Sequence, residues 1–143
     1  MKKTTLLNAP LSAVVARVGH TDTLVLCDAG LPIPDGPERV DLAVVKGLPG
    51  FLDVLKALAS ELQIERIVIA EEMAKISPDF ERQFRDAVGK IGDAQEQVIL
   101  IDTIPHQEFK RRTSQSRAIV RTGECTSYAN ALIVCGVSSA FTR

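Results

Sequence analysis

The chain has 143 residues, of which 45% are apolar and only 4% aromatic, with no Trp. This length suits one domain, and its core has to be built from Val, Ile, Leu and Ala, which is typical of a sheet covered by helices. The formal charge is −1, with Lys and Arg scattered among Asp and Glu, so the clustered cations that bind nucleic-acid phosphates are lacking and we expect no nucleic-acid partner.

The sequence also bears on compartment. The basic start Met1–Thr5 is not followed by the apolar region of a signal peptide, and no apolar stretch approaches membrane-spanning length. The three cysteines are odd in number and contain no Cys-x-x-Cys pair, which is the usage of a reducing compartment. Cys27 and Cys135 lie in apolar runs and are expected to act as small hydrophobic residues. We therefore expect a soluble, cytoplasmic protein without a membrane partner.

The N-terminal half alternates helix-like and strand-like segments. A helix is predicted over Leu11–Val18, where apolar residues recur on one face. Pro10 suits its first turn, and Gly19 suits its end because glycine adopts a left-handed conformation at little cost. The further predicted elements are strands at 23–27 and 40–45, a helix at 51–62, and a buried strand at 64–70.

In the C-terminal half, Ser77-Pro78 predicts a helix start, with Ser77 as the N-cap and proline in the first turn. The apolar face of that helix runs from Phe80 to Ile91. The basic cluster Lys110–Arg112 is interpreted as a solvated helix face or helix end. The remaining predicted elements are strands at 98–101, 118–121 and 131–137 and a helix at about 106–114.

Strands spaced by helices predict a three-layer α/β/α single domain over residues 1–143, with a largely parallel central sheet. In such sheets, ligands gather at the carboxyl ends of the strands. Four polar segments are expected at these ends: Asp28–Gly30, Glu71-Glu72, Asp102–His106 and Gly123–Asn130.

The chain has only two histidines, His20 and His106, and each lies at a predicted junction between a strand and a loop. Imidazole suits proton transfer near neutral pH, although each ring can instead be an ordinary surface group. Asp28 ends an apolar strand and is either a turn residue or a carboxylate that binds hydroxyls or orients a histidine. Asp22, two residues after His20, either supports that histidine or caps the turn.

The segment Gly123–Asn130 is the densest polar stretch between two predicted strands. It holds the only tyrosine, Tyr128, and Asn130 offers both a donor and an acceptor. Sugar hydroxyls need this mixture, because each of them both donates and accepts. A plain polar loop remains the alternative interpretation.

Several other chemistries lack support. The two histidines have no metal-ligand spacing, so a zinc site is weakly indicated. The sequence has no Gly-x-Gly-x-x-Gly, no Walker phosphate loop and no Gly-x-Ser-x-Gly elbow. Cys125 as a nucleophile and Glu71-Glu72 as a catalytic carboxylate pair are weaker interpretations, and the two glutamates are better read as a helix cap or a solvated pair.

A resemblance sharpens this interpretation. The motifs that carry it span nearly the whole chain: Gly19–Val25, Cys27–Pro34, Ile69–Glu72, Arg121–Cys125 and Tyr128–Asn130. Together they resemble the RbsD/FucU sugar mutarotase family, and within it the branch that acts on ribose. Residues 35–46 and 78–92 match less well, and Pro105 departs from the usual pattern beside His106.

The resemblance implies an RbsD-like fold and an intramolecular isomerase of sugar catabolism. Such an enzyme interconverts the β-pyranose and β-furanose forms of D-ribose by acid–base ring opening and closure, which supplies furanose for ribose phosphorylation. It implies no cofactor and no metal. His20 corresponds to the acid–base residue, and the substrate-binding positions are Asp28, His106, Tyr128, Ala129 and Asn130.

The resemblance further implies a ring-like homo-oligomer, commonly a homodecamer, with a site shared between subunits. Tyr128 and Asn130 would then lie beside a histidine of another chain. Three alternatives stay open: a fucose-type mutarotase, a non-catalytic ribose-binding accessory of a transporter, and a structural subunit.

Overall fold

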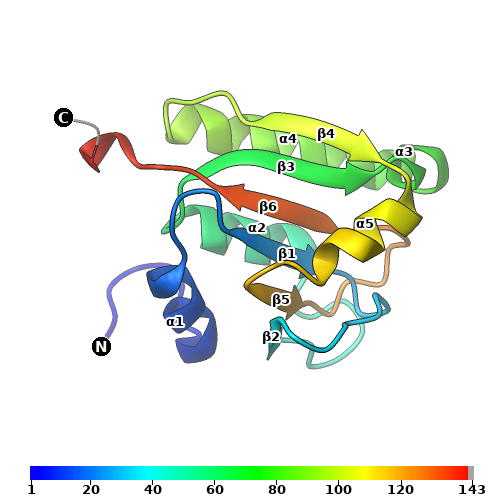
Figure 1. Cartoon of the computed structure of the whole chain (residues 1–143), viewed down its shortest axis with the longest axis horizontal. Coiled ribbons are helices and arrows are strands. Elements are labelled where there is room, and N and C mark those ends of the chain that lie inside the picture. The colour runs from blue at the N-terminus through cyan, green and yellow to red at the C-terminus, as the bar shows by residue number, and fades with distance from the viewer. Residues whose placement is uncertain (142–143) are drawn as a thin grey trace.

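The computed structural model describes residues 1–141, so the expected domain of 1–143 is described except for its last two residues. Its elements form one six-stranded sheet with helices on both faces (Figure 1). The strands are β1 Thr23–Cys27, β2 Glu38–Asp41, β3 Ile64–Ala70, β4 Leu100–Ile104, β5 Ala118–Arg121 and β6 Ala131–Cys135. The helices are α1 Ala9–Arg17, α2 Phe51–Ala59, α3 Glu72–Ile76, α4 Pro78–Ala94 and α5 His106–Thr113, followed by the 3₁₀ turn Ser139–Phe141.

The sheet order is β2-β5-β1-β6-β3-β4, and every neighbouring pair is parallel except the two that involve β6. The predicted largely parallel sheet is therefore confirmed. Because β6 runs against β1 and β3, its amino end lies at their carboxyl ends. This direction brings the segment before β6 to the edge of the sheet where ligands are expected.

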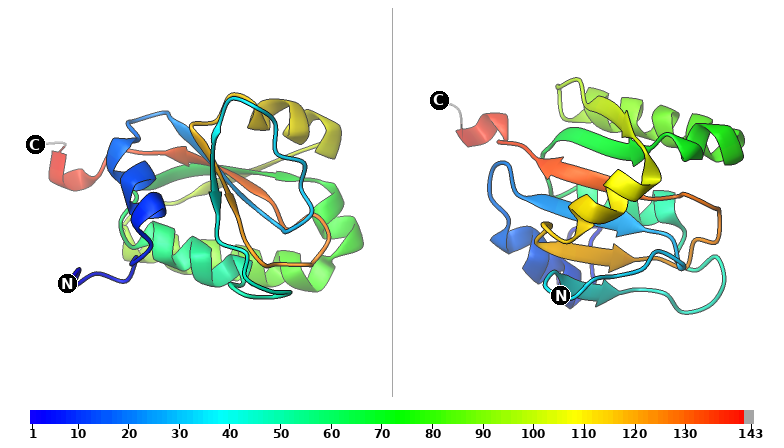
Figure 2. Two further views of the ribbon diagram at one scale, coloured as in Figure 1. Left: turned by 90° about the horizontal axis from the view of Figure 1, so that it is seen from below. Right: turned by 45° about the vertical axis from the view of Figure 1, so that its right-hand side comes forward.

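Helices cover the two faces unequally (Figure 2). The face packed by α1, α2 and α4 holds the larger core, in which Phe51, Leu58 and Phe84 are fully buried. The other face is covered by α5, whose Phe109 packs in a smaller cluster with Val25, Cys27, Leu31, Val68, Ile119 and Leu132. The three-layer prediction is confirmed, with one thick and one thin helical layer.

Two of the three thiols are part of this packing. Burial raises the pKa of Cys27 to about 12 and the pKa of Cys135 to about 11, because the thiolate would lose its hydration. Both behave as small hydrophobic residues, as expected, and neither forms a disulfide.

The strand predicted at 40–45 is present, but it lies at 38–41 and residues 42–45 are not part of it. The residues that follow β2 form a turn. In this turn the N–H of Val44 donates to Leu48 O at 3.0 Å, and the N–H of Gly47 donates to Gly123 O at 2.6 Å. Val44 and Val45 are consequently exposed. An apolar run of this length does not by itself distinguish a strand from a turn that packs elsewhere.

Other boundaries differ less. The helix predicted at 51–62 ends at Ala59, β4 begins two residues later than expected, β6 ends at Cys135, and the short α3 was not predicted. The first helix ends at Arg17 with Val18 extended, so Gly19 does not end it in a left-handed conformation; the left-handed residue nearby is Thr21, in the turn that follows, with φ +70°. No helix within residues 1–141 is both long and apolar enough to cross a membrane.

The start of α4 is where Ser77-Pro78 predicted it, but Ser77 does not cap the helix with its hydroxyl. Its Oγ instead donates to the carbonyl oxygen of Ser127 at 2.9 Å. The contact ties the beginning of α4 to the polar segment before β6. The hydroxyl of Ser77, predicted to cap the helix, therefore anchors the loop that carries candidate ligand-binding residues.

Candidate active site

A pocket of about 510 Å³ lies at the carboxyl edge of the sheet. Three segments line it: residues 28–32 after β1, His106 at the start of α5, and the segment before β6 from Glu124 to Asn130. Of the four segments expected at this edge, the Asp28 segment, His106 and the Gly123–Asn130 segment thus meet in one pocket. They meet because the carboxyl ends of parallel strands share one edge and β6 enters the sheet there.

Asp28 and Asn130 form the centre of the pocket wall. The N–H of Asp28 donates to Asn130 Oδ1 at 2.9 Å, and Asn130 Nδ2 donates to Asp28 Oδ2 at 3.1 Å. The N–H of Gly30 donates to the other carboxylate oxygen, Oδ1, at 2.9 Å. Each carboxylate oxygen can accept more than one hydrogen bond, so Asp28 keeps capacity for a ligand hydroxyl.

His106 is the first residue of α5, and Pro105 before it adopts the extended conformation of a helix cap. The N–H of His106 donates to Glu72 Oε2 at 3.0 Å. The imidazole meets the ring of Tyr128 edge-on, with centroids 4.9 Å apart. The departure from the family pattern at Pro105 thus leaves the His106 ring in the pocket.

The pKa of the His106 imidazole is lowered, first by burial and then by the nearby Lys110 charge, while Glu72 and Asp28 oppose the shift. A lowered pKa favours the uncharged ring at neutral pH. Its Nδ1 is buried and has no hydrogen-bond partner among residues 1–141. A buried polar atom without a partner is costly, so this nitrogen is a point at which a ligand can form a hydrogen bond.

Tyr128 and Ala129 contribute differently. Tyr128 has a left-handed backbone, with φ +63°, which is uncommon for a bulky residue. The side chain of Ala129 is buried in the larger core. Ala129 is also absent from the pocket lining, so its backbone is the one part left for a ligand contact, whereas Tyr128 lines the pocket.

Glu124 shapes the segment between Gly123 and Asn130. Its Oε1 accepts from the N–H and hydroxyl of Thr126, at 3.0 and 2.7 Å, and from the N–H of Cys125 at 3.0 Å; Oε2 faces the N–H of Phe51 at 3.5 Å. Burial acts to raise the pKa of Glu124, but these hydrogen bonds outweigh burial, and the pKa is lowered. The carboxylate is an internal anchor that also connects the pocket wall to the start of α2.

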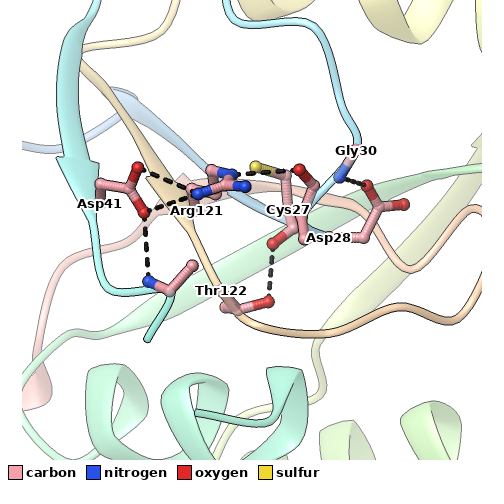
Figure 3. Close-up of polar contacts among 8 residues, drawn as sticks. Cys27, Asp28, Gly30, Asp41, Arg121 and Thr122 are labelled. Atoms are coloured by element: carbon pink, nitrogen blue, oxygen red, sulfur yellow. Dashed lines mark hydrogen bonds and ion pairs between the residues drawn. The ribbon is translucent and has the colours of Figure 1, made fainter. Parts of the chain in front are cut away.

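Arg121 holds the turn after β1 that carries Asp28 (Figure 3). Its Nε donates to Ala29 O at 3.0 Å, and its Nη1 donates to both carboxylate oxygens of Asp41, at 3.2 and 3.1 Å. Thr122 adds a hydrogen bond from its hydroxyl to Cys27 O at 2.8 Å. The turn after β1 is therefore tied to β5 and, through the Arg121–Asp41 ion pair, to β2.

Sequence reasoning missed Arg121, Glu72 and Glu124 as structural supports of the pocket. Glu72 was noted only as part of the Glu71-Glu72 pair at the end of a strand. In the structure the two carboxylates separate: Glu71 pairs with Lys75 at 3.1 Å, and Glu72 accepts from His106. They do not form a catalytic carboxylate pair. Within residues 1–141 no group of three His, Cys, Asp or Glu side chains is placed to hold a metal ion.

His20 lies at the other edge of the sheet. It precedes β1, whereas Asp28 follows this strand; five strand residues at ~3.3 Å each separate the two edges by about 16 Å. The Nε2 of His20 lies 3.0 Å from Glu65 Oε2. Within one chain, Asp28 therefore does not orient His20, and the acid–base candidate is not in the pocket.

Comparison with known proteins adds to this geometry. A model of the RbsD / FucU transport protein family matches residues 1–138. A D-ribose pyranase of Glaesserella parasuis serovar 5 (strain SH0165) is 53% identical over 137 residues, which cover 96% of this chain and 99% of that protein. A D-ribose pyranase of Aliivibrio salmonicida (strain LFI1238) is 49% identical with the same coverage.

Two solved structures are also similar. Bacillus subtilis RbsD complexed with D-ribose superposes with a TM-score of 0.86 and 38% identity, covering 96% of this chain and 98% of that one. A fucose mutarotase from Streptococcus pneumoniae in complex with L-fucose has a TM-score of 0.74 over 96% of this chain and 99% of its own, but only 22% identity. The second likeness shows the fold alone.

Proposed function

The chain belongs to the RbsD / FucU transport protein family, and from this premise we propose that it interconverts the β-pyranose and β-furanose forms of D-ribose. Relatives that share about half of its residues over nearly their full length are named D-ribose pyranase. The ribose-bound relative is 38% identical, against 22% for the fucose mutarotase. The enzyme is thus an intramolecular isomerase, and its furanose product serves ribose phosphorylation.

The observation that carries this proposal is that Nδ1 of His106 has no partner within residues 1–141 and lies in a pocket that also presents Asp28, Tyr128 and Asn130. A sugar hydroxyl donates one hydrogen bond and accepts others. Neutral His106 and the Asp28 carboxylate can accept from the sugar, and the Tyr128 hydroxyl can do either. The backbone of Ala129 completes the proposed substrate-binding set.

Ring interconversion needs proton transfer in addition to binding. A base removes the proton of the anomeric hydroxyl, the ring oxygen takes up a proton, the bond between C1 and the ring oxygen breaks, and the open aldehyde closes on a different hydroxyl. All atoms and electrons stay within the sugar, so general acid–base groups suffice, and they contribute about 10²–10⁴-fold. We assign this proton transfer to His20.

Because His20 lies at the opposite edge of the sheet from the pocket, the proposal requires a second copy of the chain. We propose that His20 of one subunit enters the pocket of its neighbour in a cyclic homo-oligomer of the decameric type, in the cytoplasm. A heterologous, head-to-tail contact between identical subunits closes into such rings. Each subunit then gives a pocket to one neighbour and a histidine to the other.

Saturation-transfer NMR between the ribose ring forms tests the activity. The protein should accelerate exchange, and His20→Ala should reduce the acceleration about 10²–10⁴-fold while ribose still binds. Ribose binding without accelerated exchange would favour a non-catalytic accessory, and faster exchange with fucose than with ribose would favour a fucose-type mutarotase.

Mixed oligomers test the shared site. His20→Ala and Asp28→Asn should each be inactive alone, but co-expression should restore about one quarter of the activity, because random mixing leaves one interface in four with both native residues. Co-expression of His20→Ala with the double variant should restore none. Absence of restoration in the first pair would contradict a site shared between subunits.

A further inference from the structure

His20 has a single ring partner in the described part of the chain, the carboxylate of Glu65, with Nε2 and Oε2 3.0 Å apart. Both side chains are about half exposed, at 53% and 41%. Ion pairs this exposed contribute little to stability, because water screens the charges and two side chains lose freedom. The contact therefore adds little to the stability of the fold, and its main effect is on the orientation of the His20 imidazole.

The backbone directs Glu65 toward this contact. The register between β3 and β6 shifts between Ile64 and Arg66, so Glu65 is the extra residue of a β-bulge. Bulges re-aim a side chain and are frequent beside active sites. Gly136 leaves room for the bulge, since a Cβ there would lie 3.2 Å from the Cβ of Glu65.

The turn that carries His20 is fixed to the same end of β6. The N–H of Thr21 donates to Cys135 O at 2.9 Å, and the N–H of Cys135 donates to Asp22 O at 2.9 Å. The Asp22 carboxylate accepts from the N–H of Gly19 and from Arg117 Nε, each at 2.8 Å. The last residues of β6 therefore hold both partners of the His20–Glu65 pair at a set separation.

We propose that Glu65 is a positioning residue that holds the His20 ring and keeps the proton of neutral His20 on Nε2, so that Nδ1 is the nitrogen that exchanges protons with the sugar. The inference rests on the proposed function, in which His20 is the proton carrier. A carboxylate can only accept a hydrogen bond, so the nitrogen facing it has to carry the proton.

The chemistry then has a defined path. The lone pair on Nδ1 takes the proton of the anomeric hydroxyl while C1–O becomes a carbonyl, and the electron pair of the breaking bond goes to the ring oxygen. The imidazolium returns the proton from Nδ1 to that oxygen, and its charge is stabilised by Glu65 in the interval. Ring closure on another hydroxyl reverses these steps.

Nitrogen-15 NMR of the imidazole rings tests the positioning directly. The chain has only two histidines, so a His106→Gln variant assigns the spectrum. Neutral His20 should carry its proton on Nε2 in the wild type, and Glu65→Ala should shift it to a mixture of both tautomers. Asp86→Asn removes a surface carboxylate that pairs with Lys90 on α4 and should change nothing.

Exchange measurements provide the second readout. Glu65→Ala should lower the exchange rate roughly 10–100-fold, by analogy with the loss of a carboxylate that orients a metal-bound histidine. Ribose affinity should be unchanged, and Glu65→Asp should recover part of the rate. A tautomer and rate unaffected by Glu65→Ala and Glu65→Gln would overturn the inference. If His20→Ala left exchange intact, the assigned role of His20 would fail instead, and the tautomer data would still report whether Glu65 holds the ring.

Discussion

The carboxamide of Asn130 joins Asp28 through two hydrogen bonds of opposite direction across 102 residues of chain. Its oxygen accepts the Asp28 N–H, and its nitrogen donates to the Asp28 carboxylate. Only a group with both a donor and an acceptor can make this pair of contacts. Asn130 thereby sets the position of a proposed sugar-binding carboxylate from the other end of the chain.

Replacing Asn130 with alanine should remove both contacts and leave the Asp28 N–H and a carboxylate oxygen short of partners. We expect the free energy of unfolding to fall by about 1–3 kcal/mol and ribose affinity to fall with it. Urea unfolding and calorimetric titration with ribose measure the two effects. Asn8→Ala is the matched control, because Asn8 caps α1 through one hydrogen bond from Leu11 N at 2.9 Å. That variant should lose stability and keep its ribose affinity, and equal losses of affinity would count against the assigned role of Asn130.

The lowered pKa of His106 predicts a pH dependence of stability. Its neutral form is favoured in the folded state, so the unfolded chain takes up the proton first as the pH falls. The stabilisation should be complete above the unfolded value of about 6.5 and be lost as the pH falls through the lower, folded value. In denaturant unfolding across this window, the wild type should lose stability relative to His106→Gln as the pH falls. Parallel curves would contradict the lowered pKa.

Ribose affinity should follow the same titration. The neutral His106 ring can accept a hydrogen bond at Nδ1, whereas the imidazolium has no acceptor. Affinity should therefore weaken as the pH drops below the folded pKa, and His106→Gln should bind more weakly at neutral pH with little pH dependence over this range.

Gly123 is predicted to tolerate no side chain. A Cβ at this position would lie 2.4 Å from Leu48 O and 2.5 Å from Leu48 N, both backbone atoms that cannot rotate away. Gly123→Ala should cost about 1–3 kcal/mol of unfolding free energy and weaken ribose binding, because Glu124 follows directly. Gly89→Ala in α4 is the control, since an added Cβ there meets nothing within 4 Å, and it should stabilise by about 0.5–1 kcal/mol. Thermal or urea unfolding measures the stability of the two variants. A Gly123→Ala protein as stable as the wild type would refute the steric argument.

Arg121 should not be replaceable by lysine. Lysine keeps the charge but lacks the planar fork that contacts Asp41 and Ala29 O together. Arg121→Lys should lower ribose affinity by loosening the Asp28–Gly30 turn and cost about 1–2 kcal/mol of stability. Arg82→Lys, at an exposed helical pair with Asp79, should leave both quantities unchanged. Calorimetric titration measures the ribose affinity of both variants. Equal affinities would show that the contacts of Arg121 with Asp41 and Ala29 do not shape the pocket.

Much of the fold follows from local pattern. Short apolar runs identified the strands at 23–27, 64–70 and 118–121, because the part of a strand that is buried on both faces has to be apolar. Val44 and Val45 are equally apolar but lie in an exposed turn. Their backbone hydrogen bonds are made with Leu48 and not with a neighbouring strand. The apolar character of a segment does not reveal which backbone groups its own N–H and C=O groups will pair with.

For the site, the sequence by itself determined which residue types were available and that Asp28 and His106 would share the carboxyl edge, because parallel strands end together. The sequence also placed the Gly123–Asn130 segment at this edge, because it follows a predicted strand. Only the tertiary structure decided that β6 runs antiparallel, which keeps Asn130 at the edge beside Asp28. It also decided that His20 lies beside Glu65, which stands at a one-residue register shift in β3. Strand direction and bulges depend on pairing with residues that are distant in the chain. The pairing energies add up over the whole sheet, so they cannot be recognised from a local stretch of sequence.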